Sequence, residues 1–278
     1  MRIAVTGATG KLGGQVIALL AAHGGHEIVG VSRRALSDPA PRVRSAEADY
    51  ADRAALRAAF DEVDTLVFVS SDGEATNVLY HHQNVISAAT EAGVGHVVLM
   101  SALDADIASP FCYAVTSGLT EALLRDRCCA ISIARTSIFT EFFLQFLSTA
   151  RARGEIRVPA GSGRISMVSI ADVGRCLAAL ALGPPTGRIH KLTGPASLDM
   201  HEVAAHVMRA WRVPVAYVDL SPAEFQQQLA TDGVDPWWCY AFSSMFASIR
   251  QHRWEQITDE VLRLTCRPPQ PLSQLIAD

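Results

Sequence analysis

The chain has 278 residues, of which 49% are hydrophobic and 19% charged, and its formal net charge is −4. A chain of this length can form one large domain or two small ones, and its apolar content is enough to bury a substantial core. The weak negative charge argues against binding of nucleic acid or of an anionic membrane surface. No stretch of the sequence is apolar enough to span a bilayer and no signal-peptide pattern is present, so we expect a cytoplasmic protein.

Strands alternate with helices in the first half of the chain. Apolar runs predict strands over residues 3–6, 27–32, 65–70, 96–101 and 130–134, with a weaker strand near 43–46. Helical periodicity lies between them, over residues 12–22, 53–60, 75–92 and 116–125. This alternation is typical of a doubly wound parallel sheet (a Rossmann fold) with helices on both faces. A ligand of such a sheet binds beyond the carboxyl ends of the strands, where the strand order reverses.

The second half is less regular and predicts a smaller α/β lobe. Its pattern indicates one strand, over residues 188–193, a loop over 154–163, and helices over 142–152, 170–182, 198–211, 223–230 and 238–250. Prolines near the end limit the last helix to the final few residues. We expect residues 1–135 to form the dinucleotide-binding domain, with the helix over 170–182 packing back on it, and residues 136–278 to form the substrate lobe.

A glycine-rich turn follows the first strand. Gly7, Gly10 and Gly13 are spaced G-x-x-G-x-x-G, and a helical pattern begins directly after them. Glycines let the backbone approach phosphates, and a helix N-terminus offers free N–H donors and a partial positive charge. The strand before and the helix after the turn favour a dinucleotide pyrophosphate site over a tight turn with no ligand. The residues expected at this site are Gly7, Thr9, Gly10, Lys11, Leu12 and Gly13.

The end of the second strand indicates which dinucleotide binds. An NAD site usually has an acidic residue there for the ribose hydroxyls, whereas this chain has Arg33 and Arg34 and no acid. Guanidinium groups match a 2′-phosphate, so we favour NADP(H) over NAD(H), with Lys11 adding charge nearby. The alternative is that both arginines are solvated surface charges. Asp49, past the third strand, is expected either at the edge of the adenine or in a helix N-cap.

Serines stand at the ends of the next two strands. Ser70 and Ser71 follow the fourth strand, and Ser101 ends the fifth. Hydroxyls at these positions point into the crevice expected for the ligand. We therefore predict that the ribose and nicotinamide lie beside Ser70, Ser71 and Ser101, together with Ser117 on the following helix.

Several longer segments carry a family resemblance. The segments TGATGKLGG, EADYADRAALRAAFDEVDTLVFVSS, HHQNVISAATEAGVGHVVLMSAL and TEALLRDRCCAISIARTSIFTEFF resemble the NmrA-like branch of the atypical short-chain dehydrogenases/reductases. Within that branch the chain is most similar to the type 2 NADPH-dependent quinone oxidoreductases and the triphenylmethane reductases. The resemblance covers nearly the whole chain. It implies a Rossmann fold and an NADP(H) cofactor, and it is less specific for the substrate.

The resemblance also places the catalytic candidates. Typical short-chain dehydrogenases use a Tyr-x-x-x-Lys pair, and Tyr113 stands at the tyrosine position while Ser117 occupies that of the lysine. With no cation there, we expect Tyr113 to keep an ordinary pKa of about 10 and to be a poor general acid. Tyr113 and Ser117 are therefore weak catalytic candidates, and Tyr113 could equally be a packing residue. The similar reductases also lack the pair and are thought to hold the substrate against the nicotinamide.

Aromatic residues are concentrated in two places. One group, Trp237 and Trp238, opens a helical run near the end of the chain, and the other is Phe139, Phe142 and Phe143. These side chains could form the core of the small lobe. Alternatively, they could form an aromatic cleft that stacks on a flat apolar substrate over the nicotinamide.

The leading prediction is therefore an NADPH-dependent oxidoreductase that transfers hydride to a quinone-like, dye-like or polyketide-like aromatic acceptor. The family also contains NADP(H)-sensing regulators, and a non-redox isomerase or cyclase on the same fold is a further alternative. We expect a small aromatic substrate as partner, and a homodimer is compatible with the sequence. We expect no metal site, because His201 and His206 are five residues apart and do not share a helix face.

Overall fold

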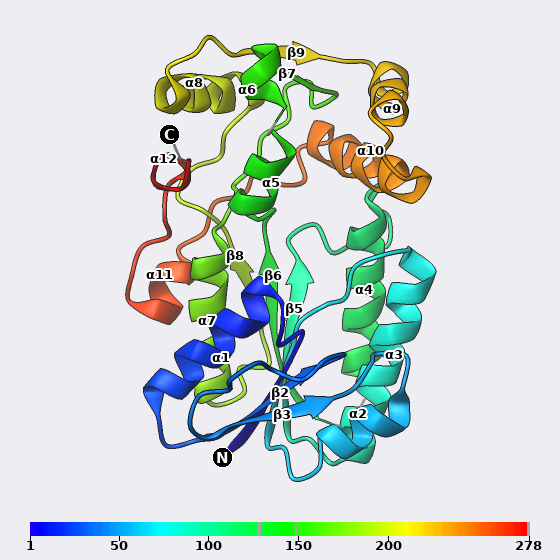
Figure 1. Cartoon of the computed structure of the whole chain (residues 1–278), viewed down its shortest axis with the longest axis vertical. Coiled ribbons are helices and arrows are strands. Elements are labelled where there is room, and N and C mark those ends of the chain that lie inside the picture. Colours follow the sequence, from blue (N-terminus) through cyan, green and yellow to red (C-terminus); the bar gives the residue numbers. More distant parts are fainter. Residues whose placement is uncertain (127–128, 148, 277–278) are drawn as a thin grey trace.

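A seven-stranded parallel sheet forms the central layer of the computed structural model, which describes residues 1–126, 129–147 and 149–276 (Figure 1). Its strands lie in the order β3-β2-β1-β4-β5-β6-β8, so the order reverses between β1 and β4. The expected doubly wound α/β fold is confirmed. The strands are β1 (Arg2–Thr6), β2 (Glu27–Ser32), β3 (Val43–Glu47), β4 (Thr65–Phe68), β5 (His96–Ala102), β6 (Ala130–Thr136) and β8 (Ile189–Leu192).

Helices cover both faces of this sheet (Figure 1). One face packs against α1 (Lys11–His23), α7 (Ile170–Leu182) and α11 (Glu260–Thr265). The other packs against α2 (Arg53–Ala59), α3 (Ala75–Glu91) and α4 (Cys112–Arg125). Successive strand residues point to opposite faces, so Val67 enters the core beneath α1 and α7 while Leu66 enters the core beneath α2–α4. The sheet and these six helices are called the sheet layer below.

The remaining elements form a second unit, called the small lobe, beyond the carboxyl ends of β5 and β6 (Figure 1). In it β7 (Glu155–Val158) pairs in parallel with β9 (Ala216–Asp219). Its helices are α5 (Thr140–Phe146), α6 (Ala150–Arg153), α8 (Met200–Trp211), α9 (Pro222–Thr231), α10 (Pro236–Arg250) and α12 (Leu272–Leu275). Helix α10 carries the aromatic run, and it begins at a defined residue because Asp235 accepts the N–H of Trp237 and Pro236 occupies the first turn.

Several boundaries in the first half differ from the sequence prediction, and two of these differences bear on the site. β4 ends at Phe68, before the predicted Ser70, because the Val69 backbone bonds to side chains instead of a strand. Its N–H donates to Thr6 Oγ1 at 3.0 Å and its carbonyl accepts the Tyr50 hydroxyl at 2.7 Å. Helix α4 begins at Cys112 and not at residue 116. Tyr113 therefore stands in its first turn.

The second half contains more elements than the sequence predicted. The single helix expected over 142–152 corresponds to α5 and α6, and the loop expected over 154–163 contains β7. Strand β9 and helix α11 were not predicted. Each is only four to six residues long, and such short segments give too little periodicity to be recognised.

The second half also contributes to the sheet layer. Helix α7 packs along α1, as expected for the helix over 170–182, and β8 adds to the sheet beside β6. The division at residue 135 thus stays a prediction. Among the described residues, no helix combines the length and the apolar character that crossing a membrane requires.

Candidate nucleotide and substrate site

The glycine turn lies between β1 and α1 and has the geometry of a phosphate cradle. Gly7 has a φ of +65°, and its carbonyl accepts the N–H of Gly10 at 2.9 Å. A Cβ on Gly13 would lie 2.3 Å from the Gly7 carbonyl oxygen, so only glycine fits there. Helix α1 has Gly10 as its N-cap and no side-chain cap, which leaves N–H groups of its first turn free for an anion. These features fit the pyrophosphate of a dinucleotide.

The other residues expected at the turn occupy different environments. Thr9 and Lys11 are exposed beside the free end of α1. The Leu12 side chain is buried in the core of the sheet layer, which limits its expected role to its backbone N–H.

The two arginines lie next to this turn. Arg33 and Arg34 are exposed just past β2, which pairs with β1, and the N–H of Ala8 in the turn donates to the Val31 carbonyl at 3.2 Å. No carboxylate of the described residues forms an ion pair with either arginine. Both guanidinium groups are therefore free to meet a phosphate.

Asp49 has a local structural role. Its side chain accepts the N–H of Ala51 at 2.8 Å, while Asp52 caps helix α2 through the N–H of Ala55. Asp49 is exposed past β3, and its contact with an adenine stays a prediction.

A cavity of about 370 Å³ lies where the carboxyl ends of β4, β5 and β6 meet the small lobe. It adjoins the glycine turn, because a Cβ on Gly7 would lie 3.5 Å from Val69, the residue before the cavity-lining Ser70. The sheet-layer side of the cavity includes Ser71, Asp72, Met100, Ser101, Phe111, Tyr113, Ser117 and Phe139. The small-lobe side includes Phe142, Trp238, Phe242, Met245 and Trp254. The sheet-layer side of the cavity is thus partly polar. The small-lobe side, called the aromatic roof below, consists mainly of aromatic rings.

The expected serines all line this cavity, with different partners. Ser70 donates to the Met100 carbonyl at 2.7 Å, and Ser101 donates to the buried carboxylate of Glu121 at 2.6 Å. Arg135 holds that carboxylate through two hydrogen bonds of 2.8 Å. The Ser71 hydroxyl is buried and has no hydrogen-bond partner among the described residues, and Ser117 also faces the cavity. Ser71 thus places a hydroxyl at the cavity that is available to bond a ligand.

Tyr113 lines the cavity, but its hydroxyl is engaged with the backbone. It donates to the Gly73 carbonyl at 2.7 Å and accepts the Gly73 N–H at 3.1 Å. The expectation of an ordinary pKa near 10 is wrong, because burial raises the pKa of Tyr113. Tyr113 is therefore even less suited to exchange a proton than the missing lysine implied.

The structure divides the expected aromatic residues. Phe139, Phe142 and Trp238 line the cavity. Phe143 is fully buried in the small-lobe core, and Trp237 contacts the Tyr113 ring without lining the cavity. The group thus divides between the core of the small lobe and the wall of the cavity, and its stacking on a substrate stays a prediction.

Comparison with known proteins identifies the family. A family model described as NAD(P)H-binding matches residues 7–184. This chain belongs to the NAD(P)H-binding family. Quinone oxidoreductase 2 of Escherichia coli is 32% identical over 237 residues, which cover 84% of this chain and 82% of that protein.

Two solved structures have the same fold across their whole length. One is the E. coli NADPH-dependent quinone oxidoreductase QOR2 in complex with NADPH, with a TM-score of 0.90, 28% identity and 98% coverage of both chains. The other is triphenylmethane reductase of Citrobacter sp., with a TM-score of 0.90, 26% identity, and coverage of 99% of this chain and 97% of the other. The resemblance to NmrA-like reductases is confirmed, as is the expectation of a reductase of this family.

Sequence reasoning missed two cavity residues of this NAD(P)H-binding protein. One is His82, which is buried, lines the cavity and accepts the N–H of Ser71 at 3.2 Å. Its spacing of four from Val78, which also lines the cavity, was the available signal. Trp254 lies beyond α10, where no local pattern points to a site.

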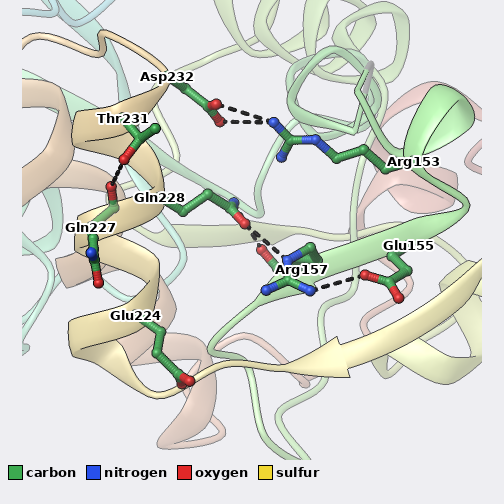
Figure 2. Close-up of a pocket in the computed structure, with 8 residues that line it drawn as sticks. All are labelled: Arg153, Glu155, Arg157, Glu224, Gln227, Gln228, Thr231 and Asp232. Carbon is green, nitrogen blue, oxygen red and sulfur yellow. Dashed lines mark hydrogen bonds and ion pairs between the residues drawn. The ribbon is translucent and has the colours of Figure 1, made fainter.

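A second, larger hollow of about 640 Å³ lies on the surface of the small lobe between β7 and α9 (Figure 2). Its walls are polar, and its arginines are already paired. Arg153 bonds Asp232 at 3.1 Å, and Arg157 bonds Glu155 at 3.0 Å and Gln228 at 3.1 Å, as Figure 2 shows. Because none of its lining residues belongs to the glycine turn or the aromatic cavity, we do not assign the nucleotide or its acceptor to it. Among the described residues, no three His, Cys, Asp or Glu side chains gather as a metal site would require.

Proposed function

We propose that this protein is an NADPH-dependent reductase that passes a hydride to a quinone-like or other flat aromatic acceptor. The observation that carries the proposal is the aromatic cavity placed directly beside the glycine turn, at the carboxyl ends of β4–β6. In a doubly wound sheet this is where the reactive end of a bound dinucleotide meets its substrate. A bound NADPH would supply the hydride.

Arg33 supports the choice of NADPH over NADH. It is exposed just past β2, which pairs with the strand leading into the glycine turn, and it forms no ion pair with any described residue. The 2′-phosphate of an NADPH bound at the turn would bring negative charge to this place. A guanidinium bonds phosphate through a bidentate, charge-assisted contact. The complex of the E. coli relative with NADPH agrees with this assignment.

Trp238, Phe142 and Phe242 would hold the acceptor. Their rings form one group, with Phe242 at 5.6 Å from Trp238 and 6.2 Å from Phe142 between ring centroids. A flat ring stacking among them would be oriented and shielded from water, so proximity and orientation supply much of the rate.

Charge at the cavity favours neutral acceptors over anionic ones. Among the described residues that line it, none is a lysine or arginine and only Asp72 is acidic. His82 also lines it, and burial lowers the pKa of His82 to about 3, so this residue is uncharged near neutral pH. A carboxylated or sulfonated acceptor would find no cation there.

The reduction of a quinone also consumes a proton. Because the Tyr113 hydroxyl donates to the Gly73 carbonyl and burial raises its pKa, we assign that proton to water rather than to Tyr113. The rate of hydride transfer should then show no dependence on the ionisation of a tyrosine.

The test is oxidation of NADPH by a panel of acceptors, measured as the loss of reduced-nicotinamide absorbance. Neutral benzoquinones and naphthoquinones should be reduced, their sulfonated counterparts more slowly, and NADH should be the poorer donor. Tight NADPH binding with no turnover of any acceptor would overturn the proposal in favour of an NADP(H) sensor. Conversion of a substrate without net NADPH consumption would instead indicate an isomerase or cyclase.

A further inference from the structure

One wall of the aromatic cavity is a short segment rather than a helix or strand. Residues 69–74, called the β4–α3 loop here, place Ser70, Ser71 and Asp72 in the lining. Side chains of two neighbouring helices hold the backbone of this loop. Its position therefore depends on those side chains as well as on its own sequence.

The first contact comes from α4. The Tyr113 hydroxyl bonds both backbone groups of Gly73, donating to the carbonyl at 2.7 Å and accepting the N–H at 3.1 Å. Gly73 has a φ of +105°, a conformation that favours glycine, and a Cβ added there would meet nothing within 4 Å. The loop thus has an unusual backbone conformation at the residue that is hydrogen-bonded to Tyr113.

The second contact comes from α3. The Thr120 hydroxyl donates to the Thr116 carbonyl at 2.7 Å, so its oxygen accepts from His82 Nδ1 at 2.7 Å. That places the proton of the neutral ring on Nδ1 and leaves Nε2 to accept the N–H of Ser71 at 3.2 Å. The histidine is 2% exposed, and its bond to Thr120 is buried.

The Tyr113 ring joins this loop to the small lobe. It lies 6.4 Å from Trp238 on α10 and 5.6 Å from Phe111, between ring centroids. Trp238 forms part of the aromatic roof of the cavity. A single side chain therefore contacts both the loop that forms one wall and the helix that forms the roof.

We propose that Tyr113 and His82 are positioning residues that hold the β4–α3 loop against the cavity, with Tyr113 setting the spacing between the loop and the aromatic roof. Tyr113, which occupies the position of a catalytic tyrosine, then acts through the shape of the cavity rather than by proton transfer. Releasing the loop widens the acceptor site and weakens acceptor binding, while the hydride step continues. The proposal rests on the proposed function only for its kinetic readout.

The experiment compares the full-length protein with Tyr113→Phe and Gly73→Ala. Tyr80→Phe, at an exposed tyrosine of α3, is the matched control. Tyr113→Phe keeps the ring and removes both bonds to Gly73, whereas Gly73→Ala strains the same loop and leaves the hydroxyl in place. The measurements are hydrogen–deuterium exchange of residues 69–74 with bound NADPH, and the kcat and KM for a naphthoquinone as functions of pH.

In Tyr113→Phe, exchange in the loop and the acceptor KM should each rise by about tenfold, the factor expected for two lost hydrogen bonds. Gly73→Ala should raise both as well, because alanine strains the same loop at a positive φ. The kcat and its pH profile should stay as in the parent protein, and Tyr80→Phe should change nothing. A large loss of kcat in Tyr113→Phe with unchanged loop exchange would overturn the proposal and make Tyr113 the acid. Unchanged exchange together with unchanged kinetics would also overturn it.

Failure of the proposed function has a different signature. If the parent protein reduces no acceptor, the exchange measurement alone still decides whether Tyr113 holds the loop. In that case, faster exchange of residues 69–74 in Tyr113→Phe supports the proposal that Tyr113 holds the loop, and unchanged exchange overturns it.

Discussion

The nucleotide end and the acceptor end of this site are built in opposite ways. The glycine turn is one continuous segment, and its shape depends on backbone contacts such as the Gly10 N–H bond to the Gly7 carbonyl. The aromatic cavity draws its lining from three strand ends, from α3, α4, α5 and α10, and from Trp254 beyond α10. A substitution on any of these elements can alter the cavity. In the turn, by contrast, the crowded position of Gly13 accepts only glycine.

This difference separates the part of the function that is fixed from the part that can vary. A cradle made of backbone accepts the same pyrophosphate whatever side chains surround it. A cavity assembled from distant side chains changes shape with each substitution, so relatives with one fold can take different acceptors. The following predictions test that contrast, from the largest expected effect to the smallest.

Gly13→Ala should cause the largest loss of nucleotide binding. The added Cβ would lie 2.3 Å from the Gly7 carbonyl oxygen, so the turn must open. We expect NADPH affinity to fall by about a hundredfold and the free energy of unfolding by about 1–3 kcal/mol. Gly14→Ala is the control, because its Cβ would have its nearest contact at an ordinary 3.5 Å. Equal NADPH affinities of the two variants in titrations would contradict the assignment of the glycine turn as the phosphate-binding site.

Arg33→Ala should remove the preference for NADPH. Loss of one charge-assisted contact to phosphate costs about 1.5–3 kcal/mol, which is roughly a tenfold to hundredfold rise in the Kd of NADPH. The Kd of NADH should not change, because NADH has no 2′-phosphate. Arg57→Ala, at an exposed arginine of α2, controls for net charge. A parallel loss of NADH binding would show that Arg33 acts on another part of the nucleotide.

Trp238→Ala should affect only the acceptor end. We expect the KM for a naphthoquinone to rise by about tenfold, from the loss of one stacking wall, with NADPH affinity intact. Phe143→Ala is the contrasting variant, because that ring is fully buried in the small lobe. It should lower the free energy of unfolding by about 3–5 kcal/mol in denaturant titrations. If Trp238→Ala instead unfolds the protein, Trp238 is core and not a wall.

His82→Gln should change the response of stability to acid. Burial lowers the pKa of His82 from 6.5 to about 3, so between these values the unfolded chain binds a proton that the folded chain does not. The stabilisation from neutral His82 is therefore complete above pH 6.5 and is lost as pH falls toward 3. His82→Gln should reduce the slope of unfolding free energy against pH in this window by up to about 1.4 kcal/mol per pH unit.

The comparison variant for that slope is His81→Gln, on the neighbouring and less buried histidine, whose charge is the second cause of the lowered pKa of His82. It should reduce the slope less than His82→Gln does, because burial is the larger cause and remains in place. A slope that is the same in His82→Gln and in the parent protein would show that His82 is not held neutral by burial.

The contrast between the two ends also explains what could be predicted from the sequence. Gly7, Gly10 and Gly13 were recognisable because local spacing fixes the turn, and the doubly wound parallel sheet followed from the alternation of strands and helices. The bond of Tyr113 to Gly73 joins residues 40 positions apart, and no periodicity encodes such a pairing. Phe142 and Phe143 are neighbours in sequence with opposite environments, which only the packing of α5 decides.

The path of the chain between the two layers has a consequence for stability. After building α5, α6 and β7 of the small lobe, the chain returns to the sheet layer as α7 and β8, leaves it again, and returns once more as α11. The buried Asp172 of α7 also accepts the N–H of Gln270, which binds the last segment to the same helix. A fragment ending at residue 135 would lack α7, and the face of the sheet that packs against α1 and α7 would be partly uncovered. We therefore expect this fragment not to fold alone. On heating, the nucleotide end and the acceptor end should accordingly unfold in one cooperative transition. A ligand that binds at either end should raise the single Tm of that transition.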